Sequence, residues 1–231
     1  NFLTDVKYNH WAYDGVKFVT QEFCIMPPTT FTEFQGDRTA TRYDTAKAFY
    51  YSVKKIERIS LKNLKVSKDQ VAINIVDLDG SNNDIVNSIV SEYGIMQTMP
   101  GKKFMGSDKI SRYELAFELN NYLRLLGEKL GKNTLEPIER TSNLKDISEE
   151  HWATPSVRNI ANKYQLMLGY PDDTFRGSNS LTRYELATIL RKFIEYIDKY
   201  IIAVIKVVPT PVPTAQPPII IIVDPQQYQG F

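Results

Sequence analysis

The sequence lacks the features that would identify a membrane protein or a disulfide-stabilised domain. Its only cysteine, Cys24, cannot form an intrachain disulfide, and because it follows Phe23 in an apolar stretch we expect it to be buried. The longest apolar runs, 201–205 and 219–223, are far shorter than the roughly 20 residues that a helix needs to cross a bilayer. We therefore expect no membrane span in this chain. The first residue is Asn1 and no signal-peptide pattern follows it, so we expect a processed or trimmed chain.

An excess of charge of one sign is also lacking. The 28 Lys and Arg residues are balanced by 27 Asp and Glu residues, so the net charge of +1 gives no global attraction to nucleic acid or to an anionic membrane. The sequence contains no Ser or Cys nucleophile motif, metal-ligand cluster or phosphate-binding loop. We therefore expect a protein that is not an enzyme and has no cofactor, and any anion that it binds must be met by local charges.

What the sequence does contain is a repeat of about 70 residues, marked by two short motifs. A Phe-x-Gly pair occurs three times, and each time an Arg-Tyr-acid triplet follows it at the same distance. The pairs begin at Phe34, Phe104 and Phe175, and the triplets begin at Arg42, Arg112 and Arg183. Because the spacing is so regular, we interpret the chain as three copies of one structural unit.

Each copy has the apolar spacing of two helices, which predicts an all-α fold of three helix-loop-helix repeats. Apolar residues three and four apart precede each Phe, at 16, 19 and 23, at 86, 89 and 93, and at 157, 160 and 164. The second helix begins with a hydroxyl three residues before an acid, the pattern of a capping box. These pairs are Thr41 and Asp44, Ser111 and Glu114, and Thr182 and Glu185. One unit of about 55 residues buries too little apolar surface alone, so the three should pack together.

The repeats divide the chain into four predicted parts. Repeat one spans 1–58, repeat two 71–126 and repeat three 142–197, and 198–231 is a Pro-rich linker with a short strand. The connecting stretches 56–70 and 126–141 are rich in Lys, Asn and Glu, which predicts solvated helix extensions or linkers. The proline run 209–218 should be an extended spacer. The lone strand 219–223 would need a partner sheet, another subunit or a further domain.

Repeat three resembles the S-layer homology domain family. The matching residues, in the order and spacing of that family's motif, are Asp146, His151-Trp152-Ala153, Gly169-Tyr170-Pro171-Asp172, Thr174-Phe175 and Thr182-Arg183-Tyr184-Glu185. Repeat one keeps the His10-Trp11 pair and its Arg triplet. Repeat two has Asn82-Asn83 near the place of that pair and is the degenerate copy. The resemblance covers roughly residues 1–197.

The resemblance implies a three-lobed helical bundle whose inter-repeat grooves bind a wall-linked glycan, in many members one that carries an anionic pyruvyl ketal. It also implies a place in the cell envelope, on the extracellular surface or on the periplasmic side of the wall. The expected function is non-covalent anchoring of a surface-layer or envelope protein to a cell-wall polysaccharide. The alternative is that decayed repeats serve as a protein–protein assembly scaffold, with self-assembly through the C-terminal tail.

Three arginines are the first candidate glycan-binding residues. Arg42, Arg112 and Arg183 lie in the first turn of their predicted helices, where free backbone amides and the helix dipole favour an anion. A guanidinium adds two parallel donors that suit a carboxylate. The alternative is that each arginine pairs with a neighbouring carboxylate and ties the repeats together.

Aromatic and acidic residues complete the candidate glycan site. Trp11 and Trp152 offer a flat apolar face to a sugar ring, and their indole N–H can donate a hydrogen bond. A Trp in a small helical repeat is more often part of the core, so packing is the favoured alternative. Tyr170, Asp172 and Asp173 form the best-kept turn of the motif. The groove that involves repeat three is therefore the best candidate for a working site.

Two further features resemble catalytic or metal sites. His10 and His151 occupy equivalent repeat positions, and because an acid/base site would not be expected to recur in separate lobes, we favour capping or a hydrogen bond to the preceding Asp. The stretch 77–84 alternates carboxylates like a calcium loop. Its Gly is at the fourth position instead of the sixth and the twelfth position is Ser88, so we favour a capping loop for the following helix.

Overall fold

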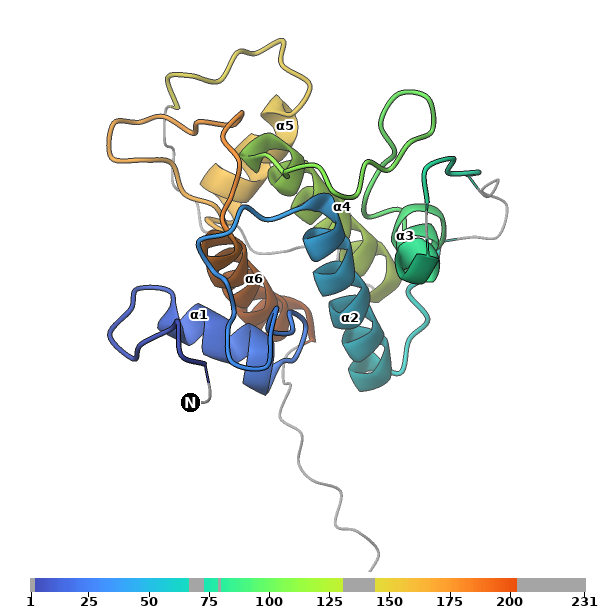
Figure 1. Cartoon of the computed structure of the whole chain (residues 1–231). Helices are drawn as coiled ribbons and strands as arrows, with labels where there is room; N and C mark the ends of the chain where they lie inside the picture. The colour runs from blue at the N-terminus through green and yellow to red at the C-terminus, as the bar shows by residue number, and fades with distance from the viewer. Residues whose placement is uncertain (1–2, 67–72, 79, 131–143, 203–231) are drawn as a thin grey trace, which may run out of the picture.

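The computed structural model describes residues 3–66, 73–78, 80–130 and 144–202, which form helices and no strands. The predicted all-α class is therefore confirmed for this part of the chain. Among the described residues, three long α-helices alternate along the chain with three short ones. In Figure 1 the long helices lie in the middle of the molecule and the short ones lie around them. The long helices are α2 (Arg42–Ser60), α4 (Arg112–Leu130) and α6 (Arg183–Ile197). The short ones are α1 (Tyr13–Lys17), α3 (Asn83–Asn87) and α5 (Thr154–Val157).

The short helices are where the sequence predicts them, before each Phe loop. Each continues into a wider π-helical turn, at Phe18–Glu22, Ser88–Glu92 and Arg158–Lys163. A single 3₁₀ turn, Gly80–Asn82, precedes α3, and a π turn, Asp198–Ile202, follows α6. The residues at the predicted apolar positions, such as Val16 and Val86, are buried.

Each short helix packs against the long helix of a different repeat. Helix α1 of repeat one contacts α6 of repeat three, α3 contacts α2, and α5 contacts α4. A short helix therefore buries its apolar face only when the neighbouring repeat is present. The three repeats complete one another's cores in a cycle.

Three buried residues in front of the long helices join the repeats at the centre of this cycle. The amide of Ala40 donates to the carbonyl of Leu181 at 2.8 Å, Leu181 donates to Ile110 at 3.2 Å, and Ile110 donates back to Ala40 at 3.1 Å. All three side chains are fully buried. Every repeat thus contributes one donor and one acceptor to a closed triangle of hydrogen bonds, so the repeats are related by an approximate three-fold arrangement.

The long helices begin as the capping boxes predict. In repeat one the Asp44 amide donates to the Thr41 hydroxyl at 3.2 Å, and the Thr41 amide donates to the Asp44 carboxylate at 2.9 Å. The Ser111 and Glu114 pair and the Thr182 and Glu185 pair form the same two bonds. Local sequence therefore determines where α2, α4 and α6 start.

The Phe loops are held by an aspartate in each repeat. Asp5 accepts hydrogen bonds from the Phe34 and Gln35 amides at 3.0 and 2.6 Å, and Gln35 has a left-handed backbone (φ 54°). Asp77 and Asp146 hold the loops of repeats two and three in the same way. The glycine two residues after each Phe lets a tyrosine of the preceding repeat in the cycle approach closely, because a Cβ on Gly106 would lie only 2.1 Å from Cζ of Tyr43.

Some expectations about burial are wrong. Cys24 is exposed, because the chain adopts a left-handed conformation there (φ 49°) where it leaves the π turn. Ile56, Leu64 and Leu126 are fully buried, so the connecting stretches are not simply solvated. The predicted unit boundaries remain predictions, and helices α2 and α4 run to Ser60 and Leu130, beyond 58 and 126. The proline run and the strand at 219–223 lie outside the described residues.

Candidate functional site

The three arginines that the sequence singles out are buried at the boundaries between repeats. Arg42, Arg112 and Arg183 are only 2%, 7% and 4% exposed. In each, Nε donates to the carbonyl of the next repeat's Phe, and Nη2 donates to a carbonyl seven residues before that Phe. The Nε bonds reach Phe104, Phe175 and Phe34 at 2.8, 2.8 and 3.0 Å, and the Nη2 bonds reach Gln97, Leu168 and Pro27 at 2.7, 2.9 and 3.1 Å.

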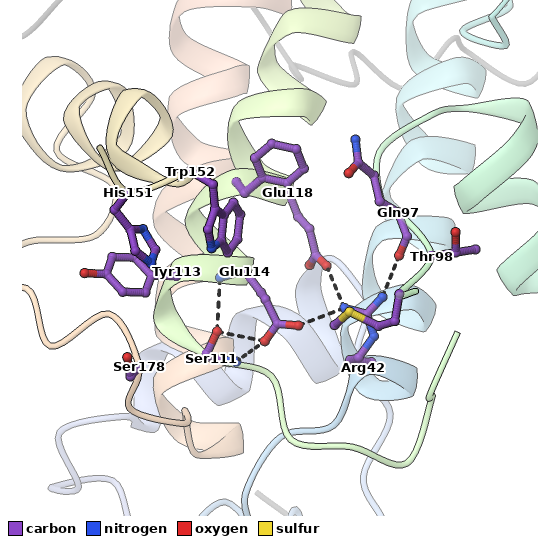
Figure 2. Close-up of a pocket in the computed structure, with 12 residues that line it drawn as sticks. Arg42, Gln97, Thr98, Ser111, Tyr113, Glu114, Glu118, His151, Trp152 and Ser178 are labelled. Atoms are coloured by element: carbon purple, nitrogen blue, oxygen red, sulfur yellow. Dashed lines mark hydrogen bonds and ion pairs between the residues drawn. The ribbon is translucent and has the colours of Figure 1, made fainter. Parts of the chain in front are cut away.

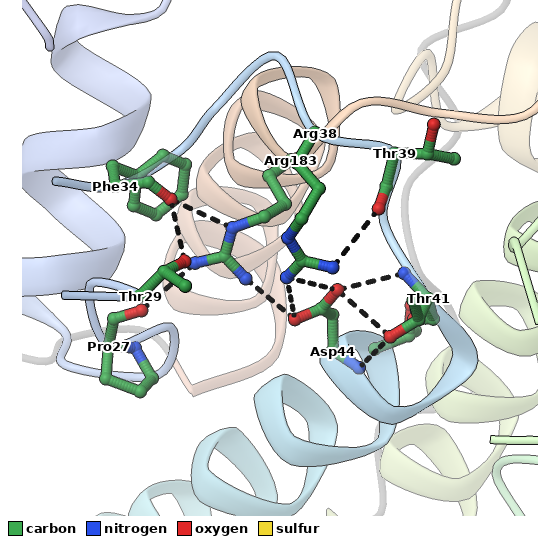
Figure 3. Close-up of polar contacts among 9 residues, drawn as sticks. Pro27, Thr29, Phe34, Arg38, Thr39, Thr41, Asp44 and Arg183 are labelled. Carbon is green, nitrogen blue, oxygen red and sulfur yellow. Dashed lines mark hydrogen bonds and ion pairs between the residues drawn. The ribbon is translucent and has the colours of Figure 1, made fainter. Parts of the chain in front are cut away.

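The carboxylate partners of the three arginines differ. Arg42 Nη1 lies 3.1 Å from Glu114 and 3.6 Å from Glu118. Arg183 Nη1 lies 2.7 Å from Asp44, which also pairs with Arg38 (Figure 3). In the part of the chain that the structure describes, Arg112 has no carboxylate within 4.0 Å.

The electrostatics of these pairs follow from burial and charge. Burial would raise the pKa of Asp44, but the Thr41 amide and the charges of Arg183 and Arg38 outweigh it, so the pKa lies below the usual value. Burial lowers the pKa of the Arg112 and Arg183 guanidinium groups. The tying of repeats through arginine is therefore seen in the structure, while contact of these arginines with a glycan stays a prediction.

The expectation that the first-turn amides are free to bind an anion is wrong. The amide of Arg42 donates to Asp108 at 3.0 Å, and the amide of Tyr43 donates to Gly106 at 2.8 Å. The equivalent amides of α4 and α6 donate to carbonyls of repeats three and one. With the third amide held by the capping box, the first turn of each long helix is already occupied by the protein.

A cavity of about 500 Å³ opens beside Arg42, where all three repeats meet (Figure 2). We call it the Arg42 groove. Its lining residues are Arg42, Gln97, Thr98, Met99, Ser111, Tyr113, Glu114, Phe117, Glu118, His151, Trp152 and Ser178. It therefore combines the start of α2, the start of α4 and the segment before α5.

The aromatic side of the Arg42 groove is formed by Trp152 and its neighbours. Trp152 is 57% exposed and meets Phe117 edge-on with ring centroids 5.5 Å apart. His151 stacks on Tyr113 at 4.1 Å, and its Nδ1 accepts a 3.3 Å hydrogen bond from the Ala153 amide. The local hydrogen bond that we expected for this histidine is present, but its partner is a backbone amide. The favoured expectation that the tryptophans belong to the core is wrong, because the indole ring lies at the surface.

Repeat one presents the same aromatic group in a different place. Trp11 is 63% exposed and meets the ring of Tyr184 edge-on at 6.1 Å, and the ring of His10 lies tilted against the same tyrosine at 4.5 Å. His10 Nδ1 accepts a 3.2 Å hydrogen bond from the Ala12 amide. The two His-Trp pairs therefore contact the equivalent tyrosine at two different repeat boundaries, with different ring angles.

The acidic side of the Arg42 groove contains a residue that sequence reasoning missed. Glu118 is 2% exposed, and one of its carboxyl oxygens has no hydrogen-bond partner among the described residues. Burial raises the pKa of Glu118 to about 8, with Arg42 lowering it and Glu114 raising it further. The equivalent positions in the other repeats, six residues after each Arg, are Ala48 and Ile189. Comparison of the three repeats would have revealed this acid on an otherwise apolar helix face.

A smaller cavity of about 270 Å³ lies beside Arg183. We call it the Arg183 groove, and its lining residues are Ile25, Met26, Pro27, Pro28, Thr29, Arg38, Asp44, Lys47 and Arg183. Figure 3 shows Arg183 and Arg38 converging on Asp44 within it. Three cationic side chains face a single carboxylate here, so the charge of this groove is positive.

The turn that the sequence favoured lies at the third boundary, next to Arg112. The ring of Tyr170 lies under both Arg112 and Arg176, at 5.0 and 4.0 Å from its centroid. Hydrogen bonds from Thr174 and Arg176 lower the pKa of Asp172 to about 2. Asp173 pairs with Lys145 at 3.2 Å. These residues lie together as expected, but Tyr170, Asp172 and Asp173 line neither of the two grooves.

Membrane-spanning helices and metal sites can both be assessed from the geometry of the described residues. No helix there is both long enough and apolar enough for a bilayer crossing. No group of three His, Cys, Asp or Glu side chains gathers there as a metal site would require. Of the stretch 77–84, Asp77 holds a Phe loop and the Asn82 side chain forms no cap bond with α3.

Comparison with known proteins gives the family of the third repeat. Residues 143–187 match the model of the S-layer homology domain. A cellulosome-anchoring protein of Acetivibrio thermocellus is 33% identical over 100 residues, which cover 43% of this chain and 21% of that protein. Outer membrane protein SlpA of Thermus thermophilus is 36% identical over 58 residues, which cover 25% of this chain and 6% of that protein. Outer membrane protein alpha of Thermotoga maritima is 33% identical over 58 residues, which cover 25% of this chain and 14% of that protein.

Proposed function

Since residues 143–187 form an S-layer homology domain, we propose that this chain anchors an envelope protein non-covalently to a cell-wall polysaccharide. The relative from Acetivibrio thermocellus is named for anchoring, and two further relatives are named as outer membrane proteins. The matched part covers about a fifth of the anchoring protein, 21%, so the function of a whole relative is carried over only as part of this proposal. The proposed role is structural and non-enzymatic, in the cell envelope.

The observation that carries the proposal is the Arg42 groove. A concave site with an exposed aromatic face and a few convergent polar groups is typical of a binding pocket for a small molecule or sugar. Trp152 supplies a flat face with an N–H donor, and Glu114 and Glu118 supply hydrogen-bonding oxygens nearby. Because three repeats build the groove together, it exists only in the folded assembly.

The other predicted residues extend the proposed contact surface. Trp11 presents its indole at a second boundary, and Tyr170, Asp172 and Asp173 line the third next to Arg112. Contact of a long polymer at more than one boundary would raise the overall affinity without any single strong site. The three arginines act in this scheme mainly by holding the boundaries in shape.

A sedimentation assay with wall sacculi from the producing bacterium tests the proposal. The chain is expected to bind sacculi that carry their attached polymer, and Trp152→Ala should weaken this binding at least tenfold. Tyr8→Ala, which removes an aromatic side chain that is exposed and lines neither groove, is the matched control and should bind as the parent does. Acid removal of the polymer distinguishes polymer from peptidoglycan as the target. A chain that binds neither kind of sacculus would show the proposal to be wrong.

The alternative of an assembly scaffold depends on the C-terminal tail, which lies outside the described residues. It predicts a complex of several chains in a native mass measurement that disappears when residues 209–231 are deleted. The same deletion should leave sacculus binding unchanged under the anchoring proposal, so one variant separates the two roles.

A further inference from the structure

The boundary between repeats one and two places one cation against two carboxyl groups. Nη1 of Arg42 lies 3.1 Å from Glu114 and 3.6 Å from Glu118, and Figure 2 shows both acids converging on it. The other two nitrogens of this guanidinium donate to backbone carbonyls of repeat two. The side chain of Glu118 is 3% exposed and that of Glu114 is 18% exposed. If both acids were ionised, this largely buried site would hold a net negative charge.

The other two boundaries carry no such excess of acid. Between repeats three and one, Arg183 and Arg38 share the carboxylate of Asp44. Between repeats two and three, Arg112 donates to two carbonyls and has no carboxylate within 4.0 Å in the part of the chain that the structure describes. Within the described residues, a surplus carboxyl group is therefore found only at the boundary that contains Glu118.

Glu118 is the group that must hold a proton while this boundary is closed. One of its oxygens has no hydrogen-bond partner among the described residues. Arg42 cannot neutralise both acids, because its Nη1 is already hydrogen-bonded to Glu114 at 3.1 Å. Burial raises the pKa of Glu118 to about 8, although the charge of Arg42 opposes the rise. An ionised Glu118 needs water around it, so ionisation favours separation of the two repeats.

We propose that Glu118 makes the boundary between repeats one and two pH-sensitive, because a protonated Glu118 keeps the boundary closed and its ionisation accompanies local opening. In the open state the carboxyl group meets water and regains an ordinary pKa, so opening releases a proton. The opening equilibrium should therefore rise by about tenfold for each pH unit between about pH 5 and pH 8 and level off above that range.

The consequence concerns the Arg42 groove, whose walls come from both sides of this boundary. Opening takes the walls apart, so the pH sets the fraction of molecules in which the groove is intact. This opening is a property of the fold and does not depend on whether the groove binds a polymer. It would remain if the anchoring proposal were wrong.

The titratable groups around Glu118 come from both repeats and from the segment before α5. Arg42 faces it from α2, and Glu114 faces it from its own helix. Tyr113 on α4 and His151 line the same groove. A substitution of Glu118 leaves these groups in place, so any pH dependence of theirs would persist in a Glu118 variant.

Hydrogen exchange of the full chain can test the proposal, because each boundary carries two equivalent amides that donate to the next repeat. At the boundary with Glu118 these are the amides of Arg42 and Tyr43. Their equivalents at the other boundaries are the amides of Arg112, Tyr113, Arg183 and Tyr184. Exchange in increasing low concentrations of urea separates local opening from global unfolding, because only global unfolding responds strongly to the denaturant.

Between pH 6 and pH 8, local opening at Arg42 and Tyr43 should increase by about tenfold or more, after correction for the intrinsic exchange rate. Local opening at the other boundaries should change by less than about threefold, because Glu118 stays protonated when they open. An equal increase at all three boundaries would overturn the proposal. Exchange of Arg42 and Tyr43 through global unfolding alone would overturn it as well.

Two variants assign the effect to Glu118. Glu118→Gln is neutral at every pH, so local opening at Arg42 and Tyr43 should no longer depend on pH. Glu128→Gln, at an exposed carboxylate on the same helix, should behave as the parent does. A pH dependence that persists in Glu118→Gln would overturn the assignment.

The carboxyl carbon resonance of Glu118 provides a check without any substitution. In the parent chain it should titrate near pH 8, and titration near the ordinary value of 4.5 would also overturn the proposal.

Discussion

The Arg42 groove and the Arg183 groove are built on the same frame and differ in their walls. In both, a buried arginine donates to the Phe carbonyl of the next repeat and to a second carbonyl seven residues before that Phe. The helix position five residues after the motif Arg is Phe117 in the first groove and Lys47 in the second. The next helix position is Glu118 on α4, in the first groove, and Ala48 on α2, beside the second. The repeat motif thus specifies how the boundaries are held, while residues outside the motif decide what each groove presents to a ligand.

The largest expected effect on stability comes from removing the buried arginines that bond one repeat to the next. Arg42→Ala should lower the free energy of unfolding by about 3–5 kcal/mol, because it leaves Glu114 and Glu118 without their cation in a largely buried site. Arg183→Ala should cost less, because Asp44 keeps its ion pair with Arg38. Arg112→Ala leaves no paired carboxylate behind and should cost less, about 2 kcal/mol for lost hydrogen bonds. Urea denaturation measures all three. Arg124→Ala, at an exposed i,i+4 pair on α4, is the control with a change under about 0.5 kcal/mol. Equal losses of stability for Arg42→Ala and Arg124→Ala would contradict the conclusion that Arg42 holds two repeats together.

A second prediction concerns Glu118, whose equivalent positions in the other two repeats, Ala48 and Ile189, are apolar. Its pKa is about 8 in the fold, well above the ordinary value for Glu, so the folded state holds a proton that the unfolded state releases above about pH 4.5. The stability from Glu118 is therefore complete at low pH and is lost as pH rises through about 8. Glu118→Gln should remove a decline on the order of 3 kcal/mol between pH 5 and pH 9. Urea titrations at several pH values measure it, and Glu128→Gln, exposed on the same helix, should not change the slope.

A third prediction concerns the wall of one groove and its link to the next repeat. A Cβ added at Gly177 would lie 2.1 Å from the Tyr113 ring, so Gly177→Ala should cost about 2 kcal/mol and displace a side chain of the Arg42 groove. Tyr113→Ala added to Gly177→Ala should recover part of that cost, because the clashing ring is gone. Denaturation of the single and double variants forms the cycle. Strict additivity of the two changes would rule out the close approach.

The smallest effect on stability is expected for a substitution that gives the Arg42 groove a lining residue of the Arg183 groove. Phe117→Lys gives the Arg42 groove the residue that Lys47 provides in the Arg183 groove, at a partly exposed position. Stability should change by less than about 1 kcal/mol. Sacculus binding should weaken about threefold, because the edge-on contact of Phe117 with Trp152 is lost from the groove. Sacculus binding that stays unchanged would mean that Phe117 does not take part in binding.

Much of the fold was predictable because its signals are local. The capping boxes at Thr41, Ser111 and Thr182 and the three-and-four spacing of apolar residues determine where helices begin and which face is buried. The exchange of short helices between repeats was not predictable in this way, because an apolar face has the same pattern whichever neighbour covers it. The π-helical turns after α1, α3 and α5 also leave no mark in a spacing of three and four.

The sequence predicted which residues belong to the candidate site better than it predicted what each residue does there. The arginines were found from their repetition, but their burial depends on carbonyls more than 50 residues away in the sequence, as with Arg42 and Gln97. The tryptophans were found from the motif, and their exposure follows from how the repeats meet. Glu118 was missed because a charged residue in a helix is usually solvated, and only its alignment with Ala48 and Ile189 marks it as unusual.

The triangle of backbone hydrogen bonds between Ala40, Ile110 and Leu181 limits how such a protein can evolve in length. A stacked repeat protein can gain or lose a unit at its end, because each unit contacts only its neighbours in a row. Here the third repeat also contacts the first, so the three repeats form a closed ring. A fourth copy would have no place in this ring, and a missing copy would leave the two remaining repeats each with one uncovered face. New binding properties must therefore arise by divergence of the copies, and the copy that has drifted furthest from the family pattern, repeat two, is the one that contributes Glu118.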